Sequence, residues 1–311
     1  MDNTLQLSRD HRPLGRTSLR CFPMAYGLWR FAGTDVKTAR AKIETALEVG
    51  ITLMDNADVY GCDGGGAFGD AEVLLGKVLR DAPHLRDRML IASKGGIDLG
   101  VPYDSSPEYL RQAVDASLER MGIECIDLYQ IHRPDFLGHP ERMAEVLVDL
   151  RAAGKIREVG VSNYTPSQFR ALQAWLPFPI ATRQPEFSCW VHDALRNGVL
   201  DQCLEYRTTP LVWSPLAGGR LALDADEAAR RPEGARLVDL IGTLDQIAES
   251  QGTHRSAVAL AWTMAHPSGV IPIIGTQNLS RIQQSVAAFD VRLTRTEWNR
   301  ILIAAQGEPL P

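Results

Sequence analysis

Short apolar runs alternate with longer amphipathic stretches along almost the whole chain, and this alternation constrains the fold more than any other feature. About eight such units follow one another with short connections. Alternating strands and helices predict a parallel sheet, because a helix is the usual connection between parallel strands. Since no linker rich in Pro, Gly or Ser divides the chain, we expect a single domain over residues 1–311. The expected fold is a closed (β/α)8 barrel of the α/β class, the TIM barrel.

The expected strands are the apolar runs, and the expected helices are the stretches in which apolar residues recur at helical spacing. Strands are expected at residues 21–26, 51–54, 88–93, 126–131, 156–161, 180–184, 210–213 and 270–274. Helices are expected at residues 36–49, 71–80, 107–121, 140–153, 166–175, 193–206, 279–289 and 296–305. Two more helices are expected before the last strand, after a polar segment over 224–234.

A doubly wound open sheet is the alternative to the barrel. That fold would be preferred if a GxGxxG motif followed the first strand, because the motif forms the phosphate-binding turn of dinucleotide-binding sheets. The run Gly64-Gly65-Gly66 lies after the second expected strand and lacks this spacing. The barrel is therefore favoured.

Charge and cysteine content narrow the classes of partner and compartment. The formal net charge of −5 argues against nucleic acid or an anionic membrane as the main partner. The five cysteines are an odd number and show no CxxC or metal-ligand spacing, which indicates reduced thiols. The first twelve residues are polar and no apolar run reaches membrane-spanning length. We therefore expect a cytoplasmic protein.

Four reactive side chains lie at the ends of expected strands or just after them. They are Asp55, Tyr60, Lys94 and His132. In a parallel barrel the strand C-termini converge on one face, where active sites form. Lys94 closes an apolar strand, and a buried ammonium needs a partner, for which Asp55 on the neighbouring strand is the natural candidate. A purely structural ion pair is the alternative for these two residues.

An acid, a phenol, an amine and an imidazole at one mouth predict a proton-transfer site. A phenol ordinarily titrates near pH 10, but a cation such as Lys94 would stabilise the phenolate and move the pKa of Tyr60 toward the working range. His132 could hold a carbonyl oxygen through a ring N–H. These roles suit carbonyl reduction, in which hydride arrives from one side and the phenol protonates the oxygen. A metal-dependent hydrolase is a weak alternative, because no His-x-His lies on an expected strand.

The segments that carry these residues resemble the signatures of the aldo-keto reductase family. The matching segments are 27–29, 55–61, 93–94, 130–132, 162–164, 184, 214–216 and 271–275. They occur in family order over nearly the whole chain, and the pattern is closest to bacterial members with longer Gly-rich loops. The resemblance implies a (β/α)8 barrel that binds NADPH across its C-terminal face without a Rossmann fold.

The same resemblance implies a role for each reactive residue. Tyr60 would be the general acid, with Lys94 and Asp55 as its tuning pair, and His132 would orient the substrate carbonyl. Around the nicotinamide, the resemblance implies that Ser162, Asn163 and Gln184 bind the carboxamide and that Trp213 stacks on the ring.

The remaining cofactor contacts are implied for the diphosphate and the adenosine phosphate. Gly218 and Gly219 would permit close approach of the backbone to phosphate, and Arg281 could pair with a 2′-phosphate. Because Thr276 and Gln277 stand where many members carry a basic residue, NADPH is expected with NADH possible. The full set of further contacts is Gly27, Trp29, Ser214, Pro215, Leu216, Gly218, Gly219, Arg220, Gly275, Thr276, Gln277, Arg281, Gln284 and Ser285.

Two functions from different classes follow from these observations. The first is an NAD(P)H-dependent oxidoreductase that reduces aldehydes or ketones to alcohols. The second is a cofactor-binding regulatory or redox-sensing barrel with little turnover. The complete set of four reactive residues and the lack of an obvious docking extension favour the enzyme. The expected partner is a small aldehyde or ketone, and nothing in the sequence demands more than a monomer.

Overall fold

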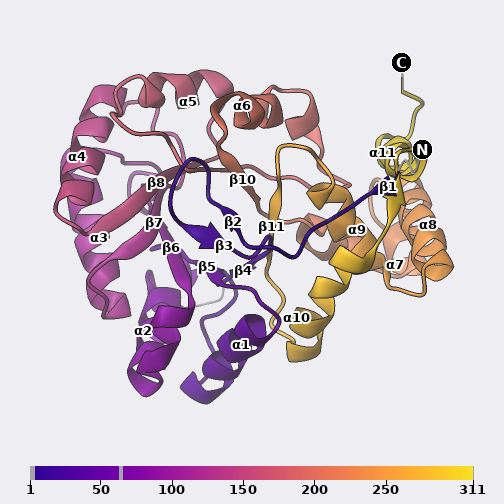
Figure 1. Cartoon of the computed structure of the whole chain (residues 1–311), viewed down its shortest axis with the longest axis horizontal. Coiled ribbons are helices and arrows are strands. Elements are labelled where there is room, and N and C mark those ends of the chain that lie inside the picture. Colours follow the sequence, from indigo (N-terminus) through magenta and orange to yellow (C-terminus); the bar gives the residue numbers. More distant parts are fainter. Residues whose placement is uncertain (1–3, 63–65, 311) are drawn as a thin grey trace.

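Eight parallel strands form a closed barrel in the computed structural model, which describes residues 4–62 and 66–310. The strands follow one another around the barrel in chain order from β4 to β11, and β11 pairs with β4 to close it. Each pair of neighbours is parallel. Helices surround the strands, and α7, α8 and α11 gather at one side beside β1 (Thr4–Leu5) (Figure 1). The expected (β/α)8 fold is confirmed.

The elements alternate as the sequence pattern predicts. The barrel strands are β4 (Ala25–Gly27), β5 (Leu53–Asp55), β6 (Leu90–Gly95), β7 (Ile126–Ile131), β8 (Ile156–Ser162), β9 (Thr182–Gln184), β10 (Thr209–Val212) and β11 (Ile271–Ile274). The helices are α1 (Val36–Glu48), α2 (Asp70–Asp81), α3 (Pro107–Met121), α4 (Pro140–Ala152), α5 (Pro166–Gln173), α6 (Val199–Tyr206), α7 (Ala225–Ala229), α8 (Gly234–Ser250), α9 (Arg255–Met264), α10 (Leu279–Ser285) and α11 (Arg295–Gln306). The 3-10 helices are η2 (Pro83–Arg88), η3 (Asp193–Leu195), η4 (Ala217–Ala222) and η5 (Val286–Asp290).

The interior of the barrel is apolar at its N-terminal end. Small and medium aliphatic side chains from the strands fill it, and a short hairpin of β2 (Arg12–Pro13) and β3 (Arg20–Cys21) adds Leu14 and Leu19 to the same cluster. The hairpin is tied to the start of β10, since the backbone N–H of Gly15 donates to the hydroxyl of Thr209 at 2.7 Å. Because this end is filled and covered, polar chemistry inside the barrel is confined to the C-terminal end.

Three expected elements differ from the structure for identifiable reasons. The run 21–26 is not one strand but β3 and β4, because Pro23 between them has no N–H for a sheet. The expected helix 193–206 divides into η3 and α6 at Gly198, whose φ is 79°. The polar segment 224–234 contains the short helix α7, which begins with a capping box formed by Asp224 and Glu227.

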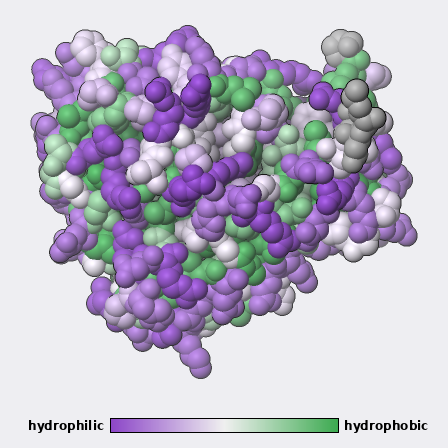
Figure 2. All heavy atoms as spheres, viewed as in Figure 1, coloured by the Kyte–Doolittle hydropathy of each residue, from purple (hydrophilic) through white to green (hydrophobic). Residues whose placement is uncertain are grey.

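The surface is predominantly polar on the face seen in Figure 2, with apolar residues scattered over it. The described part of the chain has no helix that is long and apolar enough to cross a membrane. The five cysteines, all within the described ranges, are free thiols.

Candidate active site

The four reactive residues come together at the C-terminal end of the barrel. Asp55 is the last residue of β5 and Lys94 is the next to last of β6, while His132 directly follows β7. Tyr60 lies in the loop between β5 and α2. Lys94 and Asp55 are almost completely buried, and Tyr60 is half-buried at the mouth.

Lys94 is the centre of the site. Its Nζ donates to Asp55 Oδ2 at 2.8 Å, to the backbone carbonyl of Asn56 at 2.7 Å and to the hydroxyl of Tyr60 at 3.0 Å. An ammonium has three N–H donors, so all of them are used. The pairing of Lys94 with Asp55 agrees with the expectation from the sequence. The contact with the Asn56 carbonyl had no sequence signal, because a backbone acceptor does not depend on residue type.

The second oxygen of Asp55 is held by two amides. Gln184 Nε2 donates to Asp55 Oδ1 at 2.9 Å, and Gln130 Nε2 lies 3.4 Å from the same oxygen. Gln130 was not among the expected site residues. Its register could have indicated it, because Gln130 pairs with Lys94 across β6 and β7 and the side chains of paired residues share one face. Gln184, expected at the nicotinamide carboxamide, contacts Asp55 in this structure.

The pKa of Tyr60 shifts in the direction opposite to the one expected from the sequence. Burial raises the pKa of Tyr60, and the opposing charge of Lys94 does not overcome it. The expected net lowering is therefore wrong, because burial outweighs one cation. The phenol stays protonated at neutral pH, which suits a group that donates a proton. Burial alone would lower the pKa of Lys94, but the charges of Asp55 and Tyr60 raise it, so the ammonium stays charged.

His132 is a neutral imidazole beside the phenol. Burial, followed by the charges of Lys94 and Arg133, lowers the pKa of His132 well below its ordinary value. The rings of Tyr60 and His132 meet edge to face, with centroids 5.8 Å apart. The Nδ1 atom of His132 has no hydrogen-bond partner among the described residues. A neutral imidazole keeps one N–H donor, so the ring can bind a carbonyl oxygen without carrying charge.

Three of the residues expected at the nicotinamide form one hydrogen-bonded group next to this site. Asn163 Nδ2 donates to Ser162 Oγ at 2.7 Å and lies 3.4 Å from the backbone carbonyl of His132. The indole N–H of Trp213 donates to Asn163 Oδ1 at 3.1 Å. Asn163 has a φ of 60°, a left-handed conformation that asparagine tolerates better than most residues. The group places an aromatic face and polar side chains at the mouth.

The loop after β10 has the backbone of an anion-binding segment. Ser214, Ala217, Gly218 and Gly219 all have positive φ values. Runs of left-handed residues can form concavities lined by backbone N–H groups, which bind phosphate oxygens. A Cβ built on Gly219 would meet no described atom within 4 Å, so the loop is open on that side. Two N–H groups of the loop are used within it, since Ala217 donates to the carbonyl of Ser214 at 2.8 Å and Gly219 donates to that of Leu216 at 3.0 Å.

A lysine from α1 reaches the segment after β11. Lys42 Nζ donates to Gln277 Oε1 at 3.0 Å, although Lys42 is 235 residues away in sequence. No basic residue was expected beside Thr276 and Gln277, and sequence spacing could not have indicated one from another element. Arg281 is exposed, and its backbone N–H donates to the cap residue Asn278.

The other expected cofactor residues have the following positions. Gly27 ends β4 beside Asp55, and Trp29 follows it with a half-exposed ring that Arg30 covers. Ser285 is buried, and its hydroxyl donates to its own helix at the carbonyl of Ile282. The remaining residues lie in the two loops just described or beside them: Gly275 and Gln284 are exposed, Pro215 is buried, Leu216 is half-buried and Arg220 is exposed.

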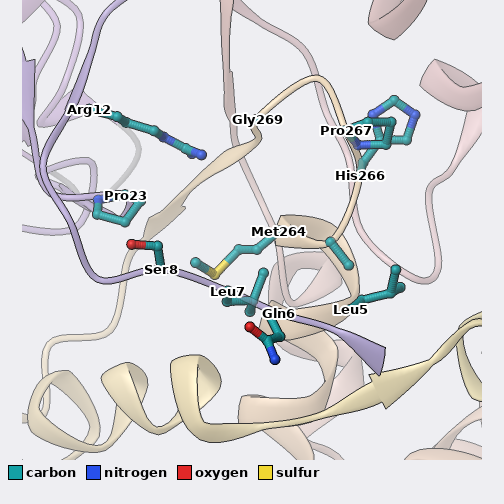
Figure 3. Close-up of a pocket in the computed structure, with 11 residues that line it drawn as sticks. Leu5, Gln6, Leu7, Ser8, Arg12, Pro23, Met264, His266, Pro267 and Gly269 are labelled. Atoms are coloured by element: carbon teal, nitrogen blue, oxygen red, sulfur yellow. The ribbon is translucent and has the colours of Figure 1, made fainter. Parts of the chain in front are cut away.

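A cavity of about 250 Å³ lies at the opposite, N-terminal end of the barrel. Its lining includes Arg12 of β2, in the N-terminal arm formed by residues 4–24. It also includes Met264 at the end of α9 and Gly269 just before β11. Figure 3 shows Arg12 directed toward the strand near Gly269. The guanidinium donates to the carbonyl of Val270 at 2.6 Å, so it fastens the arm to the barrel. This cavity is separate from the four reactive residues.

Metal ligands do not gather in the described part of the chain. No group of three or more His, Cys, Asp or Glu side chains there could hold a metal ion.

Comparisons with known proteins agree on one family. The model of the Aldo/keto reductase family matches residues 23–305. The 6-dehydroglucose reductase of Novosphingobium aromaticivorans is 46% identical to this chain, and the alignment covers 99% of each protein. The protein of the same name from Agrobacterium fabrum is 37% identical, over 92% of this chain and 94% of the relative. The structure of glycerol dehydrogenase AKR11B4 from Gluconobacter oxydans aligns with a TM-score of 0.84, 26% identity and 98% coverage of each chain.

Proposed function

The chain belongs to the aldo-keto reductase family of oxidoreductases, and from this premise we propose that it reduces an aldehyde or ketone to the alcohol, with NADPH as hydride donor and Tyr60 as general acid. The observation that carries the proposal is the triple contact of Lys94 with Asp55, Asn56 and Tyr60. That contact places a buried cation against a phenol at the open end of the barrel, where a substrate can reach it.

The residues of this chain divide the chemistry between them. NADPH, when bound, supplies the hydride that adds to the carbonyl carbon. Tyr60 gives its proton to the carbonyl oxygen as negative charge develops there, and the phenolate left behind takes a proton back from solvent. Lys94 stabilises that phenolate from 3.0 Å away. Asp55 keeps the ammonium charged and oriented.

His132 has the role of orienting the substrate. Because its imidazole is neutral, it offers an N–H to the carbonyl oxygen without competing with Tyr60 as an acid. The two rings are in edge-to-face contact, with centroids 5.8 Å apart, so the phenol and the imidazole are close neighbours.

The cofactor would lie across the same end of the barrel. Ser162, Asn163 and Gln184 are assigned to the carboxamide, and Trp213 to the nicotinamide face. The open loop after β10 is assigned to the diphosphate. Lys42 and Arg281 are assigned to the 2′-phosphate, which favours NADPH over NADH. The other cofactor assignments from the sequence stand as part of this proposal.

The substrate class is taken from the relatives. Two of them, at 46% and 37% identity, are named 6-dehydroglucose reductase. We therefore propose 6-dehydroglucose as a substrate of this chain, reduced at its carbonyl group. A redox-sensing barrel with little turnover is not favoured, because the four residues of the site are complete.

The deciding experiment is a reduction assay with the purified protein. 6-Dehydroglucose and 4-nitrobenzaldehyde would each be supplied with NADPH and, in parallel, with NADH, and loss of the reduced nicotinamide absorbance would be followed. We expect carbonyl-dependent oxidation of NADPH, and a rate at least about 100-fold lower for Tyr60→Phe, as removal of a general acid predicts. Undiminished reduction by Tyr60→Phe would show that the assigned acid is wrong. Tight NADPH binding without turnover would favour the sensor.

A further inference from the structure

A second polar cluster lies behind the proposed active site, on the outer side of the barrel wall. Ser93 pairs with Tyr129, and Lys94 pairs with Gln130, across β6 and β7. Successive side chains of a strand point to opposite faces. Because Lys94 points into the barrel, Ser93 and Tyr129 point outward toward α2 and α3. Asp58, from the loop that carries Tyr60, is fully buried beside them.

The cluster contains more buried carboxyl groups than cations. Glu72 of α2 is completely buried and accepts from Arg120 Nε of α3 at 2.7 Å and from the hydroxyl of Ser93. Arg120 therefore neutralises Glu72. No side chain among the described residues donates a hydrogen bond to either carboxyl oxygen of Asp58. The cluster thus has two buried carboxyl groups and one arginine. Arg120 pairs with Glu72, and Asp58 has no ion-pair partner among the described residues.

The surroundings of Asp58 therefore disfavour its charged form. Burial, followed by the charge of Glu72, raises the pKa of Asp58 well above its ordinary value, and the charge of Arg120, the backbone N–H of Val59 and the charge of Lys94 oppose the shift only in part. A neutral carboxyl group can both donate and accept a hydrogen bond. The hydroxyl of Tyr129 also has no partner among the described residues.

Gly95 leaves the space into which the Tyr129 hydroxyl and the Asp58 carboxyl group both extend, without a hydrogen bond between them. A Cβ built on Gly95 would lie 2.1 Å from the Tyr129 hydroxyl and 3.1 Å from Asp58 Oδ2. Any larger residue at position 95 would displace one of them. The glycine at the end of β6 therefore lets the Asp58 side chain lie against the back of the strand.

The backbone around Asp58 connects this cluster to Tyr60. The N–H of Asn56 donates to the carbonyl of Ala92 at 2.8 Å, and the N–H of Asp58 donates to the carbonyl of Lys94 at 3.0 Å. These bonds extend the β5–β6 pairing past the end of β5. The chain then turns, with the N–H of Tyr60 donating to the carbonyl of Ala57 at 3.2 Å. Asp58 is thus the last attachment to β6 before the phenol.

We propose that Asp58 is a positioning residue for the general acid: its side chain, buried behind β6 beside Gly95 and Tyr129, anchors the turn 57–60 and so maintains the contact between Tyr60 and Lys94. The inference rests on the proposed function, since it requires Tyr60 to be the acid. Asp58 itself touches neither substrate nor cofactor.

The test compares Asp58→Ala with Asp58→Asn in the full chain. The alanine variant loses the anchor, and we expect kcat to fall about 10-fold or more, with the KM for NADPH changed less than about 2-fold. Reduction requires a protonated phenol, so kcat falls above the pKa of Tyr60. A looser Lys94 contact raises that pKa, and the alkaline limb of the kcat profile therefore moves to higher pH. Asparagine has the same shape, no charge and an N–H donor, so Asp58→Asn should retain kcat within about 3-fold.

A matched control separates positioning from general loss of structure. Asp127 is an equally buried carboxylate on β7, and it accepts from Arg86 and Arg157 at 3.0 and 2.8 Å. It lies near the N-terminal end of the strand, away from Tyr60. Asp127→Asn should lower the melting temperature and leave the alkaline limb in place. If Asp58→Ala does not fold, Gly95→Ala, whose Cβ would lie 3.1 Å from Asp58 Oδ2, should move the limb in the same direction by a smaller amount.

Three results would overturn the inference. They are an unchanged kcat in Asp58→Ala, an equal loss in Asp58→Asn and Asp58→Ala, and a loss of kcat that follows the melting temperature while the alkaline limb stays in place. Failure of the proposed function is distinguishable, because Tyr60→Phe would then remain active whatever the Asp58 variants show.

Discussion

Single residues from distant elements reach the mouth of this barrel. Lys42 is the clearest case, because it brings a buried ammonium from α1 to Gln277 and contacts no carboxylate among the described residues. Burial lowers the pKa of Lys42, while the charge of Asp35 opposes that shift. A buried ammonium without a carboxylate in contact gains from binding an added anion. The phosphate that distinguishes NADPH from NADH is such an anion.

The prediction at this scale concerns cofactor discrimination. Lys42→Met should weaken the binding of NADPH about 10-fold or more and change that of NADH less than about 2-fold, because a charge-assisted contact is lost only to the extra phosphate. Quenching of protein fluorescence would measure both dissociation constants without turnover. Lys37→Met, an exposed lysine on the same helix, is the matched control and should change neither value. An equal loss for both cofactors would show that Lys42 only supports α1.

The sequence was sufficient to place the reactive residues but not to find their supports. Asp55, Lys94 and His132 could be located because apolar strands end next to them. Gln130 and Lys42 could not be assigned in this way, since their contacts depend on strand register and helix packing. The pKa of Tyr60 was expected to fall, whereas it rises, because its direction depends on burial that only the folded chain shows.

At the scale of elements, close contact between α2 and α3 supports the segment that carries Glu72 and Arg120. Gly76 of α2 makes this contact possible. A Cβ at position 76 would lie 2.3 Å from the carbonyl oxygen of Arg120 and 3.0 Å from the backbone of Met121. Backbone atoms cannot move aside as a flexible side chain can, so the two helices would have to separate.

Gly76→Ala should therefore destabilise the protein by about 1–3 kcal/mol, the usual cost of overpacking. Gly242→Ala on α8 is the matched control, because a Cβ there meets no described atom within 4 Å. Alanine costs less backbone entropy than glycine in a helix, so this variant should gain about 0.5–1 kcal/mol. Urea unfolding followed by circular dichroism would measure both. A neutral or stabilising Gly76→Ala would contradict the packing.

Element boundaries were predictable where local signals are strong. The helix expected at 107–121 begins and ends at those residues, because Ser106 caps it, Pro107 opens it and Gly122 ends it with a φ of 65°. The run 21–26 failed as a single strand because apolar character hid the effect of Pro23. Apolar pattern alone does not report where a backbone N–H is missing.

At the scale of the whole molecule, closure of the barrel follows from the eightfold alternation. The interior is so narrow that side chains fill its N-terminal end, which leaves one end for chemistry. What the pattern could not show is that the β2–β3 hairpin covers that filled end, or that β1 (Thr4–Leu5) pairs with β12 (Leu293–Thr294) across the chain. Both are long-range pairings of very short strands, for which no periodicity exists.

The whole fold should lose stability in mild acid, because it buries histidines as neutral rings. Burial lowers the pKa values of His132, His192 and His266 below the ordinary value of 6.5. Between the lowered and the ordinary values, the unfolded chain binds more protons than the folded one. Stability from these groups is therefore fully present above pH 6.5 and is lost as the pH falls below it.

The melting temperature should accordingly fall as the pH is lowered from about 7.5 to about 5.5. His132→Gln should reduce the steepness of that fall, because glutamine keeps a hydrogen-bonding side chain and cannot take up a proton. His84→Gln, at an exposed position in η2, should leave the steepness unchanged. Scanning calorimetry of the three proteins at matched ionic strength would measure the slopes. Since His192 and His266 keep part of the fall in this variant, the slopes of His132→Gln and the unaltered protein are compared directly, and equal slopes would mean that folding does not lower the pKa of His132.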